Sequence, residues 1–222
     1  MPRTDQRWQR PSLFSERQLL KYQGGVNVEK LIADAQSELA ESQPEQFKIL
    51  LLGAMAGLRR REIDLLEWDS FRWKGNAIEI KPTEFFEGKS EDSYGLIEVD
   101  SELMDIFRGY RAQATDVFVI ESDQPPKLVD WNRYRCGLHF EKLAIWLRAH
   151  NVTGDKPLHV LRKEFGSRIN AKGGIHAASR ALRHADLSVT NQFYTDNRSR
   201  VVTGLGHLLE SPSNIVPMRE AV

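Results

Sequence analysis

The stretch LHVLRKEFGSRINAKGGIHAASRALRHADLSVTNQFY, residues 158–194, carries the strongest functional signal in this chain. It places His159 three residues before Arg162, adds a further histidine at His184, and ends on Tyr194. On a helix, residues three apart are neighbours on one face, so the first two side chains would lie together. The stretch therefore predicts cations and a hydroxyl gathered where a phosphate could bind.

Helix signals divide this stretch into short elements. We expect one helix over 158–172, which the glycine pair at 173–174 would end, and a second over 174–183. A third short helix would carry Tyr194. The stretch is therefore predicted to form three consecutive helices, separated by turns at the glycines and before the tyrosine.

A second basic group lies well upstream, in GLRRRE at residues 57–62. It opens a predicted helix over 58–68, with Arg59–Arg61 in the first turn. Positive charge at a helix start opposes the macrodipole, so helix propensity does not account for three arginines there. A bound anion would account for them, and so would a solvated basic turn.

The rest of the chain alternates between helical and extended signals. The apolar spacing predicts helices over 26–39, 44–56, 101–113 and 132–150, and short strands at 71–73, 77–82, 95–100 and 117–120. Ser101 is expected to cap the third of these helices. The expected core side of the fourth is Leu138, Phe140, Leu143, Ile145, Trp146 and Leu147. The predicted fold class is mainly α with a small antiparallel β-sheet (α+β).

The segment between the second and third strands, TEFFEGKSEDSY at 83–94, is predicted to be a hairpin tip that carries Lys89. A lysine at a hairpin tip is usually just solvated. It is also placed to reach a ligand bound beside the sheet. Glu91 and Asp92 follow it without a third ligand at suitable spacing, so no metal site is predicted.

The formal net charge of zero hides a polarised distribution of charge along the chain. Residues 62–129 hold 7 Lys and Arg against 16 Asp and Glu, whereas residues 131–200 hold 13 against 5. Such a chain can present a basic face to a polyanion even though its pI is neutral. Segment-to-segment variation in surface charge is the simpler explanation when charge is considered alone.

Several classes of protein are excluded by composition. A single cysteine, Cys136, rules out an internal disulfide and a multi-thiolate metal site. No apolar run approaches the length of a membrane span. The polar start MPRTDQRWQR lacks the apolar centre of a signal peptide. We therefore expect a cytoplasmic protein that does not enter a membrane.

The singled-out residues could together carry out phosphoryl chemistry. Arg59 and Arg162 could clamp one phosphodiester and stabilise the extra negative charge of a pentavalent transition state. The hydroxyl of Tyr194 is a poor nucleophile at its ordinary pKa of about 10, but neighbouring cations lower that pKa and a histidine can accept the proton. Lys89 is a candidate general acid for the departing alkoxide. None of these steps requires a metal.

Each of these motifs has an ordinary explanation when taken alone, but their joint order resembles that of one family. The chain resembles the catalytic domain of tyrosine recombinases, the phage-integrase type. The matching segments are Gly57–Glu62, Gly88–Ser90, His159–Arg162, Leu182–His184 and Tyr194–Asp196. The resemblance implies the tyrosine-recombinase catalytic-domain fold and site-specific cutting and rejoining of DNA, with no cofactor and no metal.

The resemblance also implies a role for each residue. Arg59 and Arg162 would bind the scissile phosphate, and Lys89 would protonate the leaving 5′ oxygen. His159 would act as general base and His184 would hydrogen-bond the phosphate. Tyr194 would be the nucleophile and would form a 3′-phosphotyrosyl link. Glu62 would support the arginines from behind. Residues expected to contact DNA are Arg60, Arg61, Arg133, Arg135, Lys163 and Arg183.

The chain departs from the family pattern in two places. Arg183 stands where the family usually has a glycine before the second histidine, which would alter a local turn. The Lys89 hairpin is unusually acidic, so Lys81 is an alternative general acid.

A type IB topoisomerase-like relaxase uses similar residues and is the closest alternative enzyme. A catalytically idle DNA-binding module is the alternative from another class.

The resemblance divides the chain into three parts. Residues 1–25 are expected to be an arm or interdomain linker, 26–200 the catalytic domain, and 201–222 a C-terminal tail that could pack on a neighbouring subunit. The expected partners are double-stranded DNA and further copies of the chain, as a dimer or tetramer on DNA. Family members usually carry an N-terminal domain that clamps the other side of the DNA.

Overall fold

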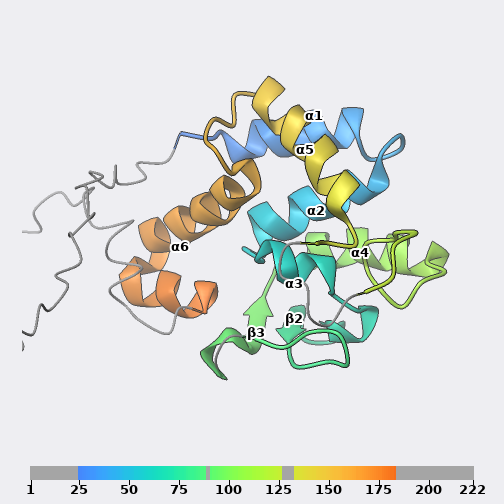
Figure 1. Ribbon diagram of the computed structural model, residues 1–222. Coiled ribbons are helices and arrows are strands. Elements are labelled where there is room, and N and C mark those ends of the chain that lie inside the picture. Colours follow the sequence, from blue (N-terminus) through green and yellow to red (C-terminus); the bar gives the residue numbers. More distant parts are fainter. Residues whose placement is uncertain (1–24, 89–90, 127–132, 184–222) are drawn as a thin grey trace, which may run out of the picture.

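The computed structural model describes residues 25–88, 91–126 and 133–183, so Lys89, His184 and Tyr194 lie outside the described residues. The described part is a helical body with a small sheet at one end (Figure 1). Its α-helices are α1 (Val28–Glu38), α2 (Pro44–Met55), α3 (Arg60–Asp64), α4 (Ser101–Gln113), α5 (Gly137–Ala149) and α6 (Pro157–Leu182). None of the helices among these residues is long and apolar enough to cross a membrane.

Helix α2 is the centre of the hydrophobic core. Its run from Phe47 to Ala54 is buried on every side, as the apolar composition predicts. Helices α1, α4, α5 and α6 all pack against α2. Because these helices surround it, α2 has no side that must face water. Pro44 occupies its first turn, where a missing N–H costs nothing.

The sheet confirms the three predicted strands before residue 100. Strands β1 (Phe71–Arg72), β2 (Ala77–Ile80) and β3 (Gly95–Glu98) pair antiparallel in the order β1-β2-β3. Ile78 faces Ile97 across β2 and β3, and both side chains are buried in the core. The mainly helical architecture with a small antiparallel sheet is therefore as predicted.

Three local predictions were wrong. Asp100, not Ser101, caps α4, because its carboxylate accepts from the backbone N–H of Leu103 at 2.7 Å. Residues 117–120 form no strand; only Phe118 makes an isolated bridge, with Glu67. The helix predicted over 58–68 stops at Asp64, because the chain must turn there to enter the sheet.

Helix α5 begins at Gly137, later than predicted, and its core side is narrower. Phe140, Leu143 and Leu147 are buried, as predicted, but Leu138 and Ile145 are 72% and 67% exposed. The latter two are seven residues apart, so they share one helix face, and that face points away from α2. Six apolar residues in ten exceed what one buried stripe can hold.

Helix α6 contains the break that the glycine pair predicted. Gly174 has φ 76°, a left-handed conformation that ends the first segment and starts a second in a new direction (Figure 1). Arg183 then ends α6, also in the left-handed region, at φ 51° and ψ 54°. The helix therefore folds back so that its end approaches the start of α3.

Candidate functional site

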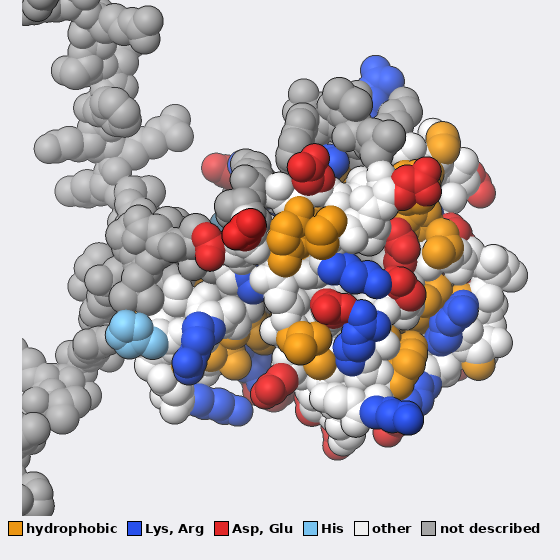
Figure 2. All heavy atoms as spheres, turned by 90° about the horizontal axis from the view of Figure 1, so that it is seen from below, with side chains coloured by type: hydrophobic (Ala, Val, Ile, Leu, Met, Phe, Trp, Pro, Cys, Tyr) orange, Lys and Arg blue, Asp and Glu red, His pale blue; other side chains and the backbone are white. Residues whose placement is uncertain are grey.

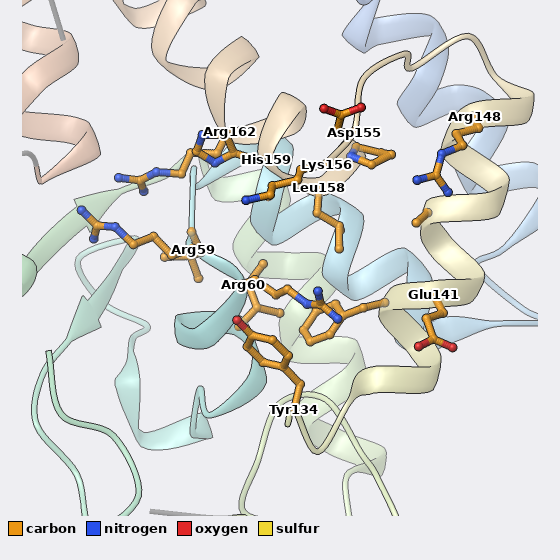
Figure 3. A pocket seen from close by; sticks show the side chains of 16 residues that line it. Arg59, Arg60, Tyr134, Glu141, Arg148, Asp155, Lys156, Leu158, His159 and Arg162 are labelled. Carbon is orange, nitrogen blue, oxygen red and sulfur yellow. The ribbon is translucent and has the colours of Figure 1, made fainter. Parts of the chain in front are cut away.

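A cavity of about 550 Å³ opens between α2, α3, α5 and the start of α6. Figure 3 shows that Arg59, His159 and Arg162 lie along one side of it, with Arg60 and Tyr134 below. Arg59 and Arg162 extend in the same direction from two different elements. The fold thus brings Arg59 and Arg162, more than a hundred positions apart in sequence, to one cavity.

Arg59 is placed by the turn between α2 and α3. It directly precedes α3, and its side chain remains 36% exposed. Its Nη1 donates to Glu62 Oε1 at 2.6 Å, and its Nη2 donates to the carbonyl of Arg183 at 2.8 Å. The guanidinium is therefore fixed at one end by α3 and at the other by the end of α6.

Arg162 lies on the inner face of α6 and is buried. Its two terminal nitrogens donate to the carbonyls of Gly57 and Leu182. The Leu182 carbonyl also receives a long contact, 3.5 Å, from Arg59 Nη2. Both guanidinium groups therefore converge on the last turn of α6.

Glu62, in the first turn of α3, is the carboxylate partner of both Arg59 and Arg183. It is buried, and its Oε2 accepts from the backbone N–H of Arg59 at 2.7 Å and from Arg183 Nη2 at 2.5 Å. Burial alone would raise the pKa of this carboxyl, but Arg183, then Arg59 and Arg162, outweigh burial and hold the pKa below its ordinary value. Glu62 is therefore ionised at neutral pH and supports the arginines.

His159 stands at the rim of the cavity, one turn from Arg162 in α6. Partial burial, followed by the charges of Lys163 and Arg162, lowers the pKa of His159 to about 4. The imidazole is therefore neutral at neutral pH and able to accept a proton. A phosphate bound beside it would raise that pKa towards the working pH.

The α5 side of the cavity is aromatic and basic. The guanidinium of Arg60 lies 4.2 Å from the ring centroid of Tyr134 and 4.7 Å from that of Phe140. This stacking fixes an otherwise flexible exposed side chain. Arg148 and Lys156 line the same cavity, and sequence reasoning did not assign them (Figure 3). Their signal was weak, because they lie in segments without a motif.

The other predicted DNA contacts divide by burial. Arg133 is exposed, and Arg61 and Lys163 are half-buried. Arg135 is 5% exposed and pairs with Asp116 at 3.0 Å, and Arg183 is 6% exposed and pairs with Glu62. Both guanidinium groups are paired with a carboxylate inside the protein, so their charge is compensated there, which does not fit a direct contact with DNA. Arg162 is equally buried, but its terminal nitrogens donate to neutral carbonyls.

The alternative general acid, Lys81, has a partner of its own. Its ammonium lies 2.7 Å from the carboxylate of Asp69, and it does not line the cavity. The hairpin that carries Lys89 is described up to Gly88 and again from Glu91. The predicted roles of Lys89, His184 and Tyr194 fall outside the described residues and stay predictions.

Charge on the sheet end of the molecule is mixed. Figure 2 shows this face, where acidic and basic side chains alternate with small apolar areas and neither sign dominates. Within the described ranges, no group of three or more His, Cys, Asp or Glu could hold a metal ion. The one cysteine, Cys136, is buried, and burial first, then Asp64, raises the pKa of its thiol above the ordinary range.

Comparison with solved structures identifies the fold. The chain is similar to a XerA recombinase, with 17% sequence identity, a TM-score of 0.55, and coverage of 78% of this chain and 57% of that one. It is also similar to a XerH site-specific recombinase bound to its difH substrate, at 16% identity and a TM-score of 0.58, covering 78% and 49%. The Tn1549 transposon integrase in complex with transposon right end DNA matches at 17% identity and a TM-score of 0.55. That match covers 75% of this chain and 58% of the integrase chain.

The similarity concerns the fold and one part of each longer protein. The chain spans between about half and three fifths of the length of these recombinases. Neither the protein-family models nor the curated protein sequences contain a match to it. The described residues therefore have the fold of tyrosine-recombinase catalytic domains, as predicted, at a sequence identity too low to carry residue roles across.

Proposed function

We propose that this chain, which has the fold of tyrosine-recombinase catalytic domains, is a site-specific DNA recombinase or integrase that breaks and rejoins DNA through a 3′-phosphotyrosyl intermediate. The observation that supports the proposal best is that the guanidinium groups of Arg59 and Arg162 converge on the last turn of α6, while both residues and His159 line one cavity. Two arginines fixed before substrate binding provide positive charge without reorganisation. A neutral imidazole beside them can take a proton.

In the proposed reaction, the Tyr194 hydroxyl attacks the scissile phosphorus while His159 accepts its proton. The bond from phosphorus to the 5′ oxygen breaks, and Lys89 gives that oxygen a proton. Arg59 and Arg162 stabilise the charge of the pentavalent transition state, and His184 hydrogen-bonds the phosphate. The phosphotyrosyl bond retains the energy of the phosphodiester. A second DNA end can therefore attack it without ATP, and the arginines supply the charge that a metal would otherwise provide.

The α5 side of the cavity suggests how the flanking duplex is held. Arg60 and Arg148 line this side, whereas Lys156 lies beside His159 at the start of α6. Contacts of lysine and arginine with backbone phosphates position a duplex without reading its sequence. We expect these residues to raise the affinity for DNA in a salt-dependent way. Assembly as a dimer or tetramer on DNA belongs to the same proposal.

Trapping the covalent intermediate tests the proposed function directly. The full chain is incubated with a pool of nicked suicide duplexes of randomised sequence, from which the cleaved strand end is lost so that rejoining cannot occur. The expected result is a detergent-stable protein–DNA adduct whose tryptic peptide carries the nucleotide on Tyr194. Sequencing the trapped DNA then supplies the preferred site, and a supercoil-relaxation assay separates strand exchange from topoisomerase-like activity.

Two conservative variants provide the control. Tyr194→Phe is expected to abolish the adduct, because it removes only the attacking oxygen. Tyr134→Phe removes the hydroxyl of the tyrosine that lines the cavity, and the adduct is expected to persist. Loss of the adduct in Tyr134→Phe but not in Tyr194→Phe would overturn the assignment of the nucleophile. A wild-type chain that forms no adduct with any duplex would overturn the function.

A further inference from the structure

Arg183 sits at the point where three separate parts of the site meet. Its Nη2 forms an ion pair with Glu62 Oε2 at 2.5 Å, and its own carbonyl accepts from Arg59 Nη2 at 2.8 Å. Its Nε donates to the carbonyl of Ser93 at 3.3 Å. One residue thus connects the start of α3, the end of α6 and the hairpin between β2 and β3.

The conformation of Arg183 is unfavourable for stability. Its φ of 51° lies in the left-handed region, where a glycine would be accommodated without the clash that a Cβ causes. Its Nη1 is buried with no hydrogen-bond acceptor among the described residues. Glycine would remove both costs, although it would also remove the buried ion pair with Glu62. A strained residue at a buried site, held by its surroundings, indicates a role other than stability.

The contact between Arg183 and Ser93 indicates what that role is. Ser93 belongs to the short 3₁₀ turn η2 (Glu91–Ser93), which directly follows the segment that carries Lys89. Gly95, at the start of β3, lies against the Arg183 side chain, since a Cβ there would be 3.7 Å from Arg183 Cδ. The guanidinium therefore anchors the base of the hairpin to the same carboxylate that holds Arg59.

We propose that Arg183 is a positioning residue that couples the Lys89 hairpin to the phosphate-binding arginines. It acts through Glu62 on Arg59 and through the Ser93 carbonyl on the hairpin, and it does not touch DNA itself. This inference rests on the proposed function. It assigns Arg183 to the alignment of the site, where its pairing with Glu62 does not fit the direct DNA contact that the sequence suggested.

The test measures the single-turnover rate of adduct formation by Arg183→Gly and Arg183→Lys at saturating suicide DNA. Arg183→Gly is expected to lower the rate at least about tenfold, because a displacement of about 1 Å in an active site can cost a hundredfold. The affinity for DNA should stay within about twofold, because a buried guanidinium releases no counterions. Arg183→Lys should recover part of the rate, because it keeps a charge for Glu62 but cannot also reach the Ser93 carbonyl.

Arg183 could act through Glu62 on Arg59 or through the Ser93 carbonyl on the Lys89 hairpin. A substrate with sulfur in place of the leaving 5′ oxygen separates these two routes. A thiolate departs without a proton, so a defect that arises through Lys89 should shrink on this substrate. Arg180→Ala removes an exposed charge from the same end of α6 and is the matched control, with a rate expected near that of the wild type.

The outcomes distinguish the two proposals. If Arg183→Gly cleaves within about twofold of the wild-type rate, the positioning role is wrong while the proposed function stands. An equal defect on the oxygen and sulfur substrates would overturn the coupling to the hairpin. A wild type that forms no adduct would overturn both the function and this inference.

Discussion

Helix α2 and the polar cluster of Arg59, Glu62, Arg162 and Arg183 both lie inside the protein, with only Arg59 partly exposed, but different forces hold them. Leu50 and the apolar residues beside it in α2 belong to the hydrophobic core, and burial of apolar area stabilises them without regard to direction. The polar cluster depends on directed bonds to one carboxylate and four carbonyls. Its members must therefore be placed accurately, or the buried charges lose their partners.

The difference explains why one region can be a scaffold and the other a site. An apolar core tolerates exchanges of similar volume, because no single contact is essential. A buried network of charges fails as a unit when one member is lost. The network is connected to the core at Gly57. This residue follows α2, and its carbonyl accepts a hydrogen bond from Arg162. The rigid α2 therefore sets the position of the arginines.

The largest expected effect comes from removing the charge of Glu62. Glu62→Gln would leave the buried Arg183 without a counter-charge, so we expect the free energy of unfolding to fall by about 3–5 kcal/mol. Because the folded-state pKa of Glu62 is lowered, its contribution is complete above its unfolded pKa of about 4.3. The contribution is lost as the pH falls through the lower folded-state pKa. Urea unfolding at a series of pH values from 7 down to about 3 measures the difference from wild type.

Leu50→Ala in α2 is the matched control for that experiment. It should cost about 2–5 kcal/mol through lost burial and a cavity. Its difference from wild type should stay constant with pH, because no titrating group is removed. A Glu62→Gln difference that is likewise constant down to pH 3 would contradict the charged network.

A smaller effect is expected at Gly57, where the two regions meet. Its φ of 61° suits glycine, and a Cβ there would collide with the ring of Phe165. Gly57→Ala should therefore destabilise the protein by about 2–3 kcal/mol and also displace the carbonyl that Arg162 binds. Thermal unfolding together with the rate of adduct formation checks both consequences. Gly75→Ala, at an open turn, is the control.

The smallest effect is a shift in the titration of one histidine. In the protein without DNA, the His159 imidazole should titrate near pH 4 because of partial burial and its cationic neighbours. Its folded-state pKa lies below the unfolded value, so the neutral form is favoured and protonation below pH 6.5 opposes folding. NMR titration of the histidine ring protons measures this pKa, with His159→Gln to assign the signal. Saturating phosphate should raise the pKa, and an unchanged value would contradict an anion bound at this cavity.

The sequence predicted the elements that depend on local pattern. The apolar run from 44 to 56, the glycine pair at 173–174 and the alternation at 77–82 became a buried helix, a kink and a strand. Where several apolar residues crowded one helix, as at Leu138 and Ile145, the pattern did not reveal which face would be covered. That choice depends on packing partners distant in the sequence.

Arg183 illustrates the same limit for the candidate site. It stands where the family pattern has a glycine, which suggested an altered turn, and like Arg60 and Lys163 it was expected to contact DNA. The fold buried it against Glu62, a residue more than a hundred positions away. Lys156 and Arg148 were missed for the opposite reason, because the cavity gathers them from segments that carry no motif.

The sequence by itself predicted most of the helices and strands in order, and it singled out the two arginines and the histidine as candidates. Hydrophobic period, turn residues and motif order are local properties, and each can be recognised within a short segment. Only the tertiary structure decided that Arg59 and Arg162 share the last turn of α6 and that Glu62 binds two arginines at once. The reason is physical: pKa shifts, buried ion pairs and the shape of a cavity depend on distances between segments, which no local pattern specifies.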